Sequence, residues 1–420
     1  MPRVFSFVLA LCALAPPAAA QAPSLTMAEA VDEAVQHNLS LLAERSNLTI
    51  AQAALVTARL RPNPVFSFSA DHLDALGTGF SGLNNGGPPE IAWRVDVPLE
   101  RGGKREARMA VATMTMSAAE AQFVDAVRTL RQEVTLACID LLAATAGRAL
   151  VTDNLRAFQD LAGVNRARAA AGSIAPSEST RSEVAMLQFR ATATRADLDV
   201  ASATARLRVL LGRPPGAALQ LADDLPAPRV HAPELPTLER LALDARPDLQ
   251  QLDAARVRSI ADLRLQEALG RIDYTVGAEY RRQQGIAGRS NSLGLFFSAP
   301  LPLLNRNQGE IARAGAERDQ AGRQIDARRA QIEADVTSAY HEFETMRDLV
   351  VAIERDLLGP ATRARETSAY TYRVGASTLL ELLDAQRAFN DTMQSYVDAE
   401  AGLRRSIARL NAAVGVEVIP

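Results

Sequence analysis

The chain has 420 residues, of which 48% are hydrophobic but only 5% are aromatic. Because the apolar residues are mostly Ala, Leu and Val, the composition disfavours the bulky core of a large globular enzyme and favours long, closely packed helices. The net charge of −3, from 46 basic and 49 acidic residues, offers no basic excess for a nucleic-acid partner. Two Cys and four His are little material for a metal cluster or a disulfide framework.

The first 20 residues have the pattern of a secretory signal. Arg3 precedes an apolar run from Val4 to Leu14, and the alanines at 18–20 offer a small-residue cleavage site. The run is too short for a transmembrane helix. We therefore expect residues 1–20 to be a signal peptide, and we expect no membrane-spanning helix in the rest of the chain.

The remaining sequence repeats itself once. At one common offset, Gly172-Ser173 aligns with Gly375-Ala376, Glu178 aligns with Glu381, and Leu207 aligns with Leu410. A long internal period of this kind indicates two copies of one structural unit. We predict a first repeat over 21–212, a Pro-rich linker over 213–236 and a second repeat over 237–420.

Each repeat begins with two helices and continues with a strand, a loop and a second strand. The first pair of helices is expected over 26–37 and 39–61, and the second pair over 237–245 and 247–269. Pro62 and Pro64 end the first pair, because the residue before a proline avoids helical geometry. Gly270 is the matching stop in the second repeat.

Strict alternation of apolar and polar residues predicts the strands. In residues 91–97, Ile, Trp and Val alternate with Ala, Arg and Asp, which is the period of a strand with two different faces. We expect β-hairpins over about 64–97 and about 272–299, with loops at 77–89 and 284–291. One interpretation is a soluble sheet that buries its apolar face. The other is a membrane sheet, because the strands are about as long as outer-membrane strands.

Four strands cannot close a barrel in lipid. The two edge strands would leave backbone groups without partners, which hydrocarbon does not tolerate, and single-chain barrels begin at about eight strands. If these strands span a membrane, several copies of the chain must therefore pool them. The strand number alone allows two, three or more copies.

Two stretches predict very long helices. Between Lys104 and Ala171 there is no Pro, and apolar residues recur at spacings of 4 and 3, which is a coiled-coil seam. We expect long helical hairpins over about 104–212 and about 308–414. Pro360 interrupts the second one, and we interpret it as a bend, because an interior Pro costs a helix about 3 kcal/mol. A purely structural coiled coil explains these helices but not the two β-hairpins.

These features together resemble the TolC family of outer-membrane export channels. The segments that carry the resemblance are the twofold repeat, the two β-hairpins, Tyr372-Arg373-Val374-Gly375 and Leu383-Asp384-Ala385-Gln386. Within that family, residues 99–105 and 300–310, each at a passage from strand to long helix, look like the cobalt–zinc–cadmium efflux branch. The resemblance covers essentially the whole mature chain.

The resemblance implies a mainly α fold with a small β part. The long antiparallel helical hairpins would form an α-barrel across the periplasm, and the β-hairpins would give four strands per chain to a trimeric 12-strand outer-membrane β-barrel. The implied partners are two further copies of the chain, outer-membrane lipid, a periplasmic adaptor (membrane fusion) protein and an inner-membrane pump of the resistance-nodulation-division class. The implied function is passive export of heavy-metal cations, without a cofactor.

The resemblance also implies functional positions. Glu381 and Asp384 correspond to acidic residues that ring the periplasmic aperture, and Tyr372 corresponds to a Tyr that links to an acid, here Glu178. Ser377 replaces an Arg of the family gate. Adaptor docking is implied at the two hairpin tips, which are Ala171, Gly172, Ser173, Val374, Gly375 and Ala376.

Several alternatives remain open at this point. The same duct could serve drugs or type I protein secretion, since it lines a path without having to select cargo. A soluble periplasmic coiled-coil scaffold or adaptor is a rival of another class, and a metalloenzyme is a third. The sequence contains no nucleophile elbow and no metal-site spacing of His and Cys, so we expect no enzyme activity and no catalytic or metal site.

Overall fold

The computed structural model describes residues 24–73, 75–77, 89–226, 229–285 and 288–419. The expected signal peptide, residues 1–20, and most of the expected loop at 77–89 lie outside the described residues. The helices are α1 (Met27–His37), α2 (Leu39–Arg59), α3 (Lys104–Ala170), α4 (Pro176–Leu210), α5 (Leu235–Ala245), α6 (Pro247–Leu269), α7 (Gln308–Ala352), α8 (Gly359–Arg373) and α9 (Leu379–Val414), with a π-helical segment, η1 (Ile353–Leu358), between α7 and α8. The strands are β1 (Val65–Asp71), β2 (Glu90–Leu99), β3 (Tyr274–Gly285) and β4 (Gly288–Ser298). The mainly helical fold with a small β part is therefore confirmed.

The chain forms two compact units, each of which draws on both sequence repeats. Unit 1 consists of the residues up to 34 together with 134–226 and 361–401, and unit 2 consists of 35–133, 227–360 and 402–420. The long helices α3 and α9 each contribute to both units. The boundaries of the two compact units therefore do not coincide with those of the two sequence repeats.

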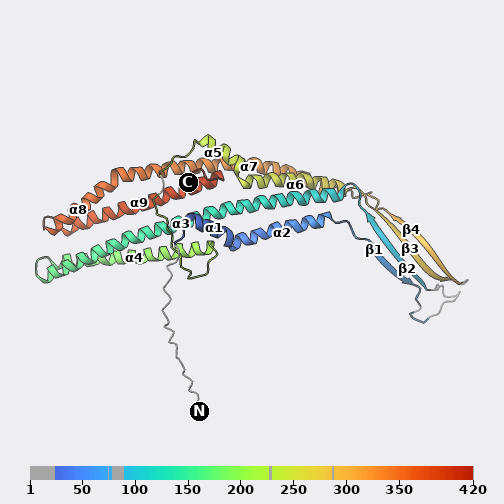
Figure 1. Ribbon diagram of the computed structural model, residues 1–420, viewed down its shortest axis with the longest axis horizontal. Coiled ribbons are helices and arrows are strands. Elements are labelled where there is room, and N and C mark those ends of the chain that lie inside the picture. Colours follow the sequence, from blue (N-terminus) through green and yellow to red (C-terminus); the bar gives the residue numbers. More distant parts are fainter. Residues whose placement is uncertain (1–23, 74, 78–88, 227–228, 286–287, 420) are drawn as a thin grey trace, which may run out of the picture. The chain divides into compact units, whose positions relative to one another are not determined.

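Unit 2 contains one antiparallel sheet in the order β1-β2-β3-β4 (Figure 1). The pairing of β2 with β3 joins the two predicted hairpins into that sheet, and Trp93 lies between Phe68 and Tyr280 in the register. The predicted loop over 284–291 is wrong, because β3 continues to Gly285 and β4 begins at Gly288. Polar residues extend these strands, since ladder hydrogen bonds join backbone groups whatever the side chains are.

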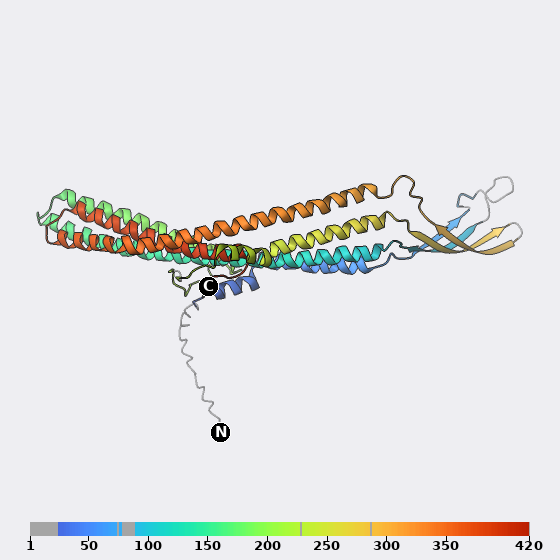
Figure 2. The same ribbon diagram turned by 90° about the horizontal axis from the view of Figure 1, so that it is seen from above.

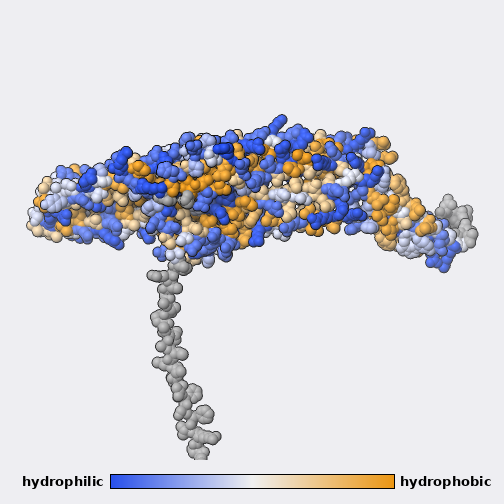
Figure 3. All heavy atoms as spheres, turned by 45° about the horizontal axis from the view of Figure 1, so that its top comes forward, coloured by the Kyte–Doolittle hydropathy of each residue, from blue (hydrophilic) through white to orange (hydrophobic). Residues whose placement is uncertain are grey.

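The two faces of the sheet differ as the alternation predicts. The apolar face is exposed to a degree that a soluble sheet would avoid, with Phe68 at 57% and Leu295 at 84%. Figure 3 shows hydrophobic residues gathered over the strands and hydrophilic ones toward the strand tips. The exposed apolar side chains of this face are Phe66, Phe68, Trp93, Val95, Val97, Leu99, Val276, Tyr280, Leu293, Leu295 and Phe297.

The helices of unit 2 pack along the predicted heptad seam. Asn38 caps α2, because its side-chain oxygen accepts a 2.9 Å hydrogen bond from the Leu41 amide. α7 packs against α5 and α6. The buried residues of α7 follow the 4 and 3 spacing along much of its length, and they are Ala314, Ala321, Ile325, Ile332, Val336, Ala339, Phe343 and Val350.

Unit 1 contains two helical hairpins that lie side by side (Figures 1 and 2). The later part of α3 pairs with α4 in one hairpin, and α8 pairs with the earlier part of α9 in the other. A stacked pair, Phe158 and Phe189, has ring centres 4.4 Å apart. The core between the hairpins consists of Phe158, Ala185, Tyr372, Leu379, Leu382 and Leu383.

The expected interruption at Pro360 takes the form of a π-helical segment. η1 ends two residues before Pro360, which is the second residue of α8. Proline has no N–H to donate to the carbonyl four residues earlier, here that of Asp356, and its ring crowds that carbonyl. The wider π register relieves this conflict within a continuous helical run.

One described helix, α3, is long enough and apolar enough over 18 residues to cross a membrane. The sequence expectation of no membrane-spanning helix rested on the lack of 18 continuous apolar residues, which this criterion does not require, and it stays an expectation. A third of that stretch, 33%, is buried inside the protein. A core helix of a soluble protein passes the same test, so the length and composition of α3 are weak support for a membrane span.

Candidate functional site

The two hairpin tips share one backbone motif. Gly172 and Gly375 adopt positive φ values of 72° and 76°, which glycine adopts without the strain that a side chain would bring. The amide of Ser173 donates to the Arg168 carbonyl at 2.9 Å, and the amide of Ala376 makes the corresponding 2.8 Å bond at the second tip. These six-residue closures end α3 and α8 as Schellman motifs do.

The tip residues expected to dock an adaptor are all exposed. They are Ala171, Gly172, Ser173, Val374, Gly375 and Ala376. A Cβ added to Gly172 or Gly375 would meet no atom within 4 Å, so the space above each turn is open. The glycines are therefore needed for backbone geometry and not for close packing inside the chain.

Tyr372 is buried against the first hairpin, where it contacts a residue that the sequence did not single out. Its hydroxyl donates a 2.8 Å hydrogen bond to Oδ1 of Asn165 on α3, which is 0% exposed. The expected link ran to Glu178, but the one hydroxyl proton is given to Asn165. Asn165 continues the buried seam of Phe158 and Ala162, and a polar residue in a heptad seam is the signal that could have found it.

The seam between the hairpins contains one further buried amide, that of Asn154, and two half-buried ones, those of Gln386 and Asn390. Gln386 on α9 donates 3.1 Å hydrogen bonds to Asn154 on α3 and to Asn390. Among the described residues, Nδ2 of Asn165 and Nδ2 of Asn390 are buried without a protein partner. Each such donor costs about 1–3 kcal/mol, so this contact is weaker than an apolar seam of the same area.

Glu381 and Asp384, the expected aperture acids, lie near the start of α9. Glu381 forms a capping box with Thr378, in which each backbone amide donates to the other's side chain at 3.3 and 3.4 Å. Asp384 lies 3.6 Å from Arg387 one turn later, with 62% of the Asp384 side chain exposed. Ser377, at the position of the family Arg, accepts a 2.9 Å hydrogen bond from Thr371. Both carboxylates thus have local structural contacts.

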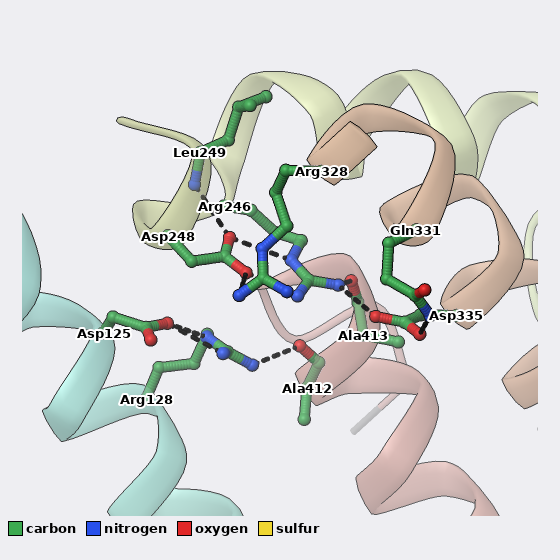
Figure 4. Close-up of polar contacts among 10 residues, drawn as sticks. All are labelled: Asp125, Arg128, Arg246, Asp248, Leu249, Arg328, Gln331, Asp335, Ala412 and Ala413. Atoms are coloured by element: carbon green, nitrogen blue, oxygen red, sulfur yellow. Dashed lines mark hydrogen bonds and ion pairs between the residues drawn. The ribbon is translucent and has the colours of Figure 1, made fainter. Parts of the chain in front are cut away.

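Unit 2 contains a buried polar anchor that the sequence analysis missed (Figure 4). Arg246 precedes α6 and forms two bonds with Asp248, at 2.6 and 3.1 Å, with only 5% and 3% of the two residues exposed. A further nitrogen of Arg246 contacts Asp335 on α7 and the carbonyl of Ala413 near the end of α9, both at 3.2 Å. One guanidinium therefore joins α6, α7 and α9.

Neighbouring charges complete this anchor. Arg328 on α7 lies 3.0 Å from Asp248, and Arg128 on α3 donates to the Ala412 carbonyl at 2.8 Å. Burial alone would raise the pKa of Asp248, but the hydrogen bonds and charge of Arg246, together with the charges of Arg328 and Arg128, outweigh it and hold that pKa below its usual value. The last carbonyls of α9 gain partners that complement the negative end of the helix dipole.

Metal-ligating side chains do not gather in the part of the chain that the structure describes. There, no group of three or more His, Cys, Asp or Glu residues is placed to hold a metal ion. Cys138 is buried, and burial followed by the charge of Asp223 raises the pKa of its thiol to about 12. The thiol therefore stays protonated, which makes it an inert packing group.

Relatives of the chain include heavy-metal resistance proteins. It is 25% identical over 365 residues to cobalt-zinc-cadmium resistance protein CzcC of Cupriavidus metallidurans, covering 86% of this chain and 83% of the relative. It is also 25% identical over 302 residues to nickel-cobalt-cadmium resistance protein NccC of Alcaligenes xylosoxydans xylosoxydans, covering 71% and 66%.

The fold and the family agree with these relatives. The crystal structure of CusC superposes with a TM-score of 0.77 at 17% identity, over 93% of this chain and 92% of CusC. The sequence model of the outer membrane efflux protein family matches residues 30–213 and 238–416, which is most of both repeats. The chain therefore belongs to the outer membrane efflux protein family and is an outer-membrane channel protein of the TolC type.

Proposed function

We propose that this chain is one subunit of a passive trimeric duct in a tripartite efflux pump, and that the duct exports heavy-metal cations. The strands would cross the outer membrane and the helical hairpins would extend into the periplasm. A periplasmic adaptor would dock at the hairpin tips, and an inner-membrane pump of the resistance-nodulation-division class would supply the energy. No chemical step on the cargo is required of this chain.

The observation that carries the proposal is the open four-stranded sheet. Within the sheet as described, β1 and β4 are its edges, and one face of it is apolar and exposed. In lipid, edge strands must find partners, and three copies would close the sheet with twelve strands. A cyclic assembly of this kind satisfies every edge with the same heterologous contact, between β4 of one copy and β1 of the next.

The metal cargo is supported by names and by sequence. CzcC and NccC are resistance proteins for cobalt, zinc, nickel and cadmium. Residues 99–105 and 300–310 resemble the same branch of the family. The names of two other relatives, protein CyaE and nodulation protein T, mention no metal. The metal cargo is therefore tested separately from the duct.

The gate is proposed at the hairpin tips of unit 1. Glu381 and Asp384 from three subunits would concentrate negative potential in a narrow opening, which attracts cations. The contact of Tyr372 with Asn165 would hold the second hairpin against the first in the resting state. The six exposed tip residues would form the docking surface for the adaptor.

Two experiments test the duct and the cargo separately. For the duct, we expect the full-length protein to fractionate with outer membranes and to run as a trimer in detergent. Recovery in the soluble periplasm without a trimer would reject the duct in favour of a scaffold. For the cargo, deletion of the gene should lower the tolerated concentrations of zinc, cobalt and cadmium, and unchanged tolerance with an intact duct would reject the metal assignment alone.

A further inference from the structure

The polar face of the sheet carries a row of charges. Residues directly opposite one another in an antiparallel sheet share a face, so Arg94 with Glu279 and Ala92 with Arg281 lie on the face away from Trp93. In the described strands this face has four carboxylates and two guanidiniums, a net charge of −2. These residues are Asp71, Glu90, Arg94, Asp96, Glu279 and Arg281.

Arg281 joins two carboxylates from different strands. Its Nη1 lies 2.7 Å from Glu90 on β2, and its Nε lies 3.0 Å from Glu279 on β3. The side chain of Glu279 is only 10% exposed, and that of Glu90 24%. Both carboxylates therefore contact the guanidinium of Arg281. This guanidinium lies between them and keeps them apart.

Arg94 contacts Asp96 and the ring of Phe296, and two glycines leave room for these two side chains. Its Nε lies 2.8 Å from Asp96, and its guanidinium carbon lies 4.0 Å from the centre of the Phe296 ring, which is a cation–π contact. A Cβ on Gly277 would lie 2.2 Å from Oδ1 of Asp96, and a Cβ on Gly294 would lie 3.0 Å from the Phe296 ring. Larger residues at these two positions would disturb the arrangement.

We propose that Arg94 and Arg281 are release residues for cations in the transmembrane pore. They keep Glu90, Asp96 and Glu279 from binding a divalent metal cation tightly, while the net negative face still attracts it. This inference rests on the proposed function, because the polar face lines a pore only when the sheet closes into a barrel. A pore must bind its ion well enough to admit it and weakly enough to release it.

The chemistry gives the direction of the effect. Carboxylate oxygens coordinate divalent cations when no other cation occupies them. A guanidinium competes for the same lone pairs through charge-assisted hydrogen bonds, and Arg281 gives one such bond to each of Glu90 and Glu279. Replacing Arg281 by an uncharged residue would leave Glu90 and Glu279 facing the same vacated volume. A cation that passes the wild-type pore would then be held there.

The test is block of the reconstituted channel by Zn²⁺ chloride in a planar bilayer. All proteins carry Glu381→Gln and Asp384→Asn, so that these acids contribute no block. Adding Arg281→Gln should lower the half-blocking Zn²⁺ concentration, because it frees two carboxylates that can coordinate the ion. We expect a shift of about tenfold, which corresponds to about 1.4 kcal/mol of added binding free energy. The matched control is Arg282→Gln, which removes the same charge from the other face of β3 and should leave the block unchanged.

Two further variants make the outcome decisive. Adding Glu90→Gln and Glu279→Gln to Arg281→Gln should restore the original half-blocking concentration. If Arg281→Gln fails to assemble, Arg94→Gln gives the same measurement through Asp96. Equal block in Arg281→Gln, Arg94→Gln and Arg282→Gln channels would overturn the inference, whereas a parent protein that conducts no ions would reject the proposed duct itself.

Discussion

Tyr372 on α8 and Asn165 on α3 form a buried hydrogen bond of 2.8 Å between the two helical hairpins of unit 1. Tyr372→Phe removes the donor and leaves the amide of Asn165 with neither of its polar atoms satisfied. We expect this to weaken the contact by about 1–3 kcal/mol and to raise the resting conductance of the reconstituted channel. The control is Tyr370→Phe, because that side chain is 61% exposed. Equal conductance of the two variants would contradict a holding role for Tyr372.

A double variant separates the hydrogen bond from the packing around it. Asn165→Leu combined with Tyr372→Phe replaces both polar partners by apolar groups, which restores a continuous seam. We expect the double variant to melt at a higher temperature than Tyr372→Phe alone, because it removes the unsatisfied amide of Asn165. Thermal unfolding of the purified trimer measures this, and a lower melting temperature for the double variant would show that the unsatisfied amide of Asn165 costs little in Tyr372→Phe.

Glu381→Gln with Asp384→Asn removes two charges from each subunit near the start of α9. Gln at position 381 can still complete the capping box with Thr378, so the helix should begin where it does now. We expect weaker block by divalent cations in single-channel recordings, because the negative potential of the opening falls. Block that matches the wild type would refute an acidic ring at these residues.

Gly375→Asn tests docking apart from turn geometry. Asn tolerates positive φ better than other side chains do, and an added side chain meets open space at this turn. The trimer and its conductance should therefore be preserved, while crosslinking to the adaptor in membranes should fall several-fold. Gly172→Asn provides the same comparison at the first tip. An adaptor that crosslinks normally to both variants would place docking elsewhere.

Asp248 should make the stability of unit 2 sensitive to acid. Its pKa is lower in the folded chain than in the unfolded one, so its contribution is complete above the unfolded value of about 3.9 and is lost as the pH falls through the folded value. Asp248→Asn breaks a buried pair and should cost about 3–5 kcal/mol at pH 7. Urea unfolding at pH 7 and pH 3 measures both effects.

The matched control for this acid sensitivity is Asp253→Asn, on the same helix but exposed. It should unfold like the wild type at both pH values. In contrast, the difference between wild type and Asp248→Asn should begin to shrink below the unfolded pKa of about 3.9, because the unfolded wild-type chain then gains a proton that the folded carboxylate binds less readily. A difference that does not change with pH would mean that packing, and not charge, explains the cost.

Helices and strands were predictable because their signals are local and periodic. The heptad seam of α7 and the alternation in β2 and β3 depend only on near neighbours in the sequence. The strand ends were not predictable, since residues 284–285 and 288–291 have no alternation of apolar and polar side chains and pair through their backbones. The π-helical form of η1 also escaped, because Pro360 indicates an interruption without saying which hydrogen-bond register relieves it.

The polar contacts required long-range partners that no spacing reveals. Tyr372 lies near the end of α8, but its partner, Asn165, is fixed by how the two hairpins pack. Arg246 and Asp248 flank a proline that begins α6, and their sequence resembles an ordinary helix start. Their role depends on α7 and the end of α9, which lie close to them only in the folded chain.

The edge positions of β1 and β4 in the described sheet also bear on how stability can be defined for this chain. If only other copies of the chain complete the sheet, the strands can regain their edge partners only when chains meet again. The free energy of unfolding of the strands therefore depends on the concentration of the chain. Dilution in detergent should then melt the strands before the helical hairpins, whose contacts lie within one chain. A melting temperature quoted for this protein would need its protein concentration beside it.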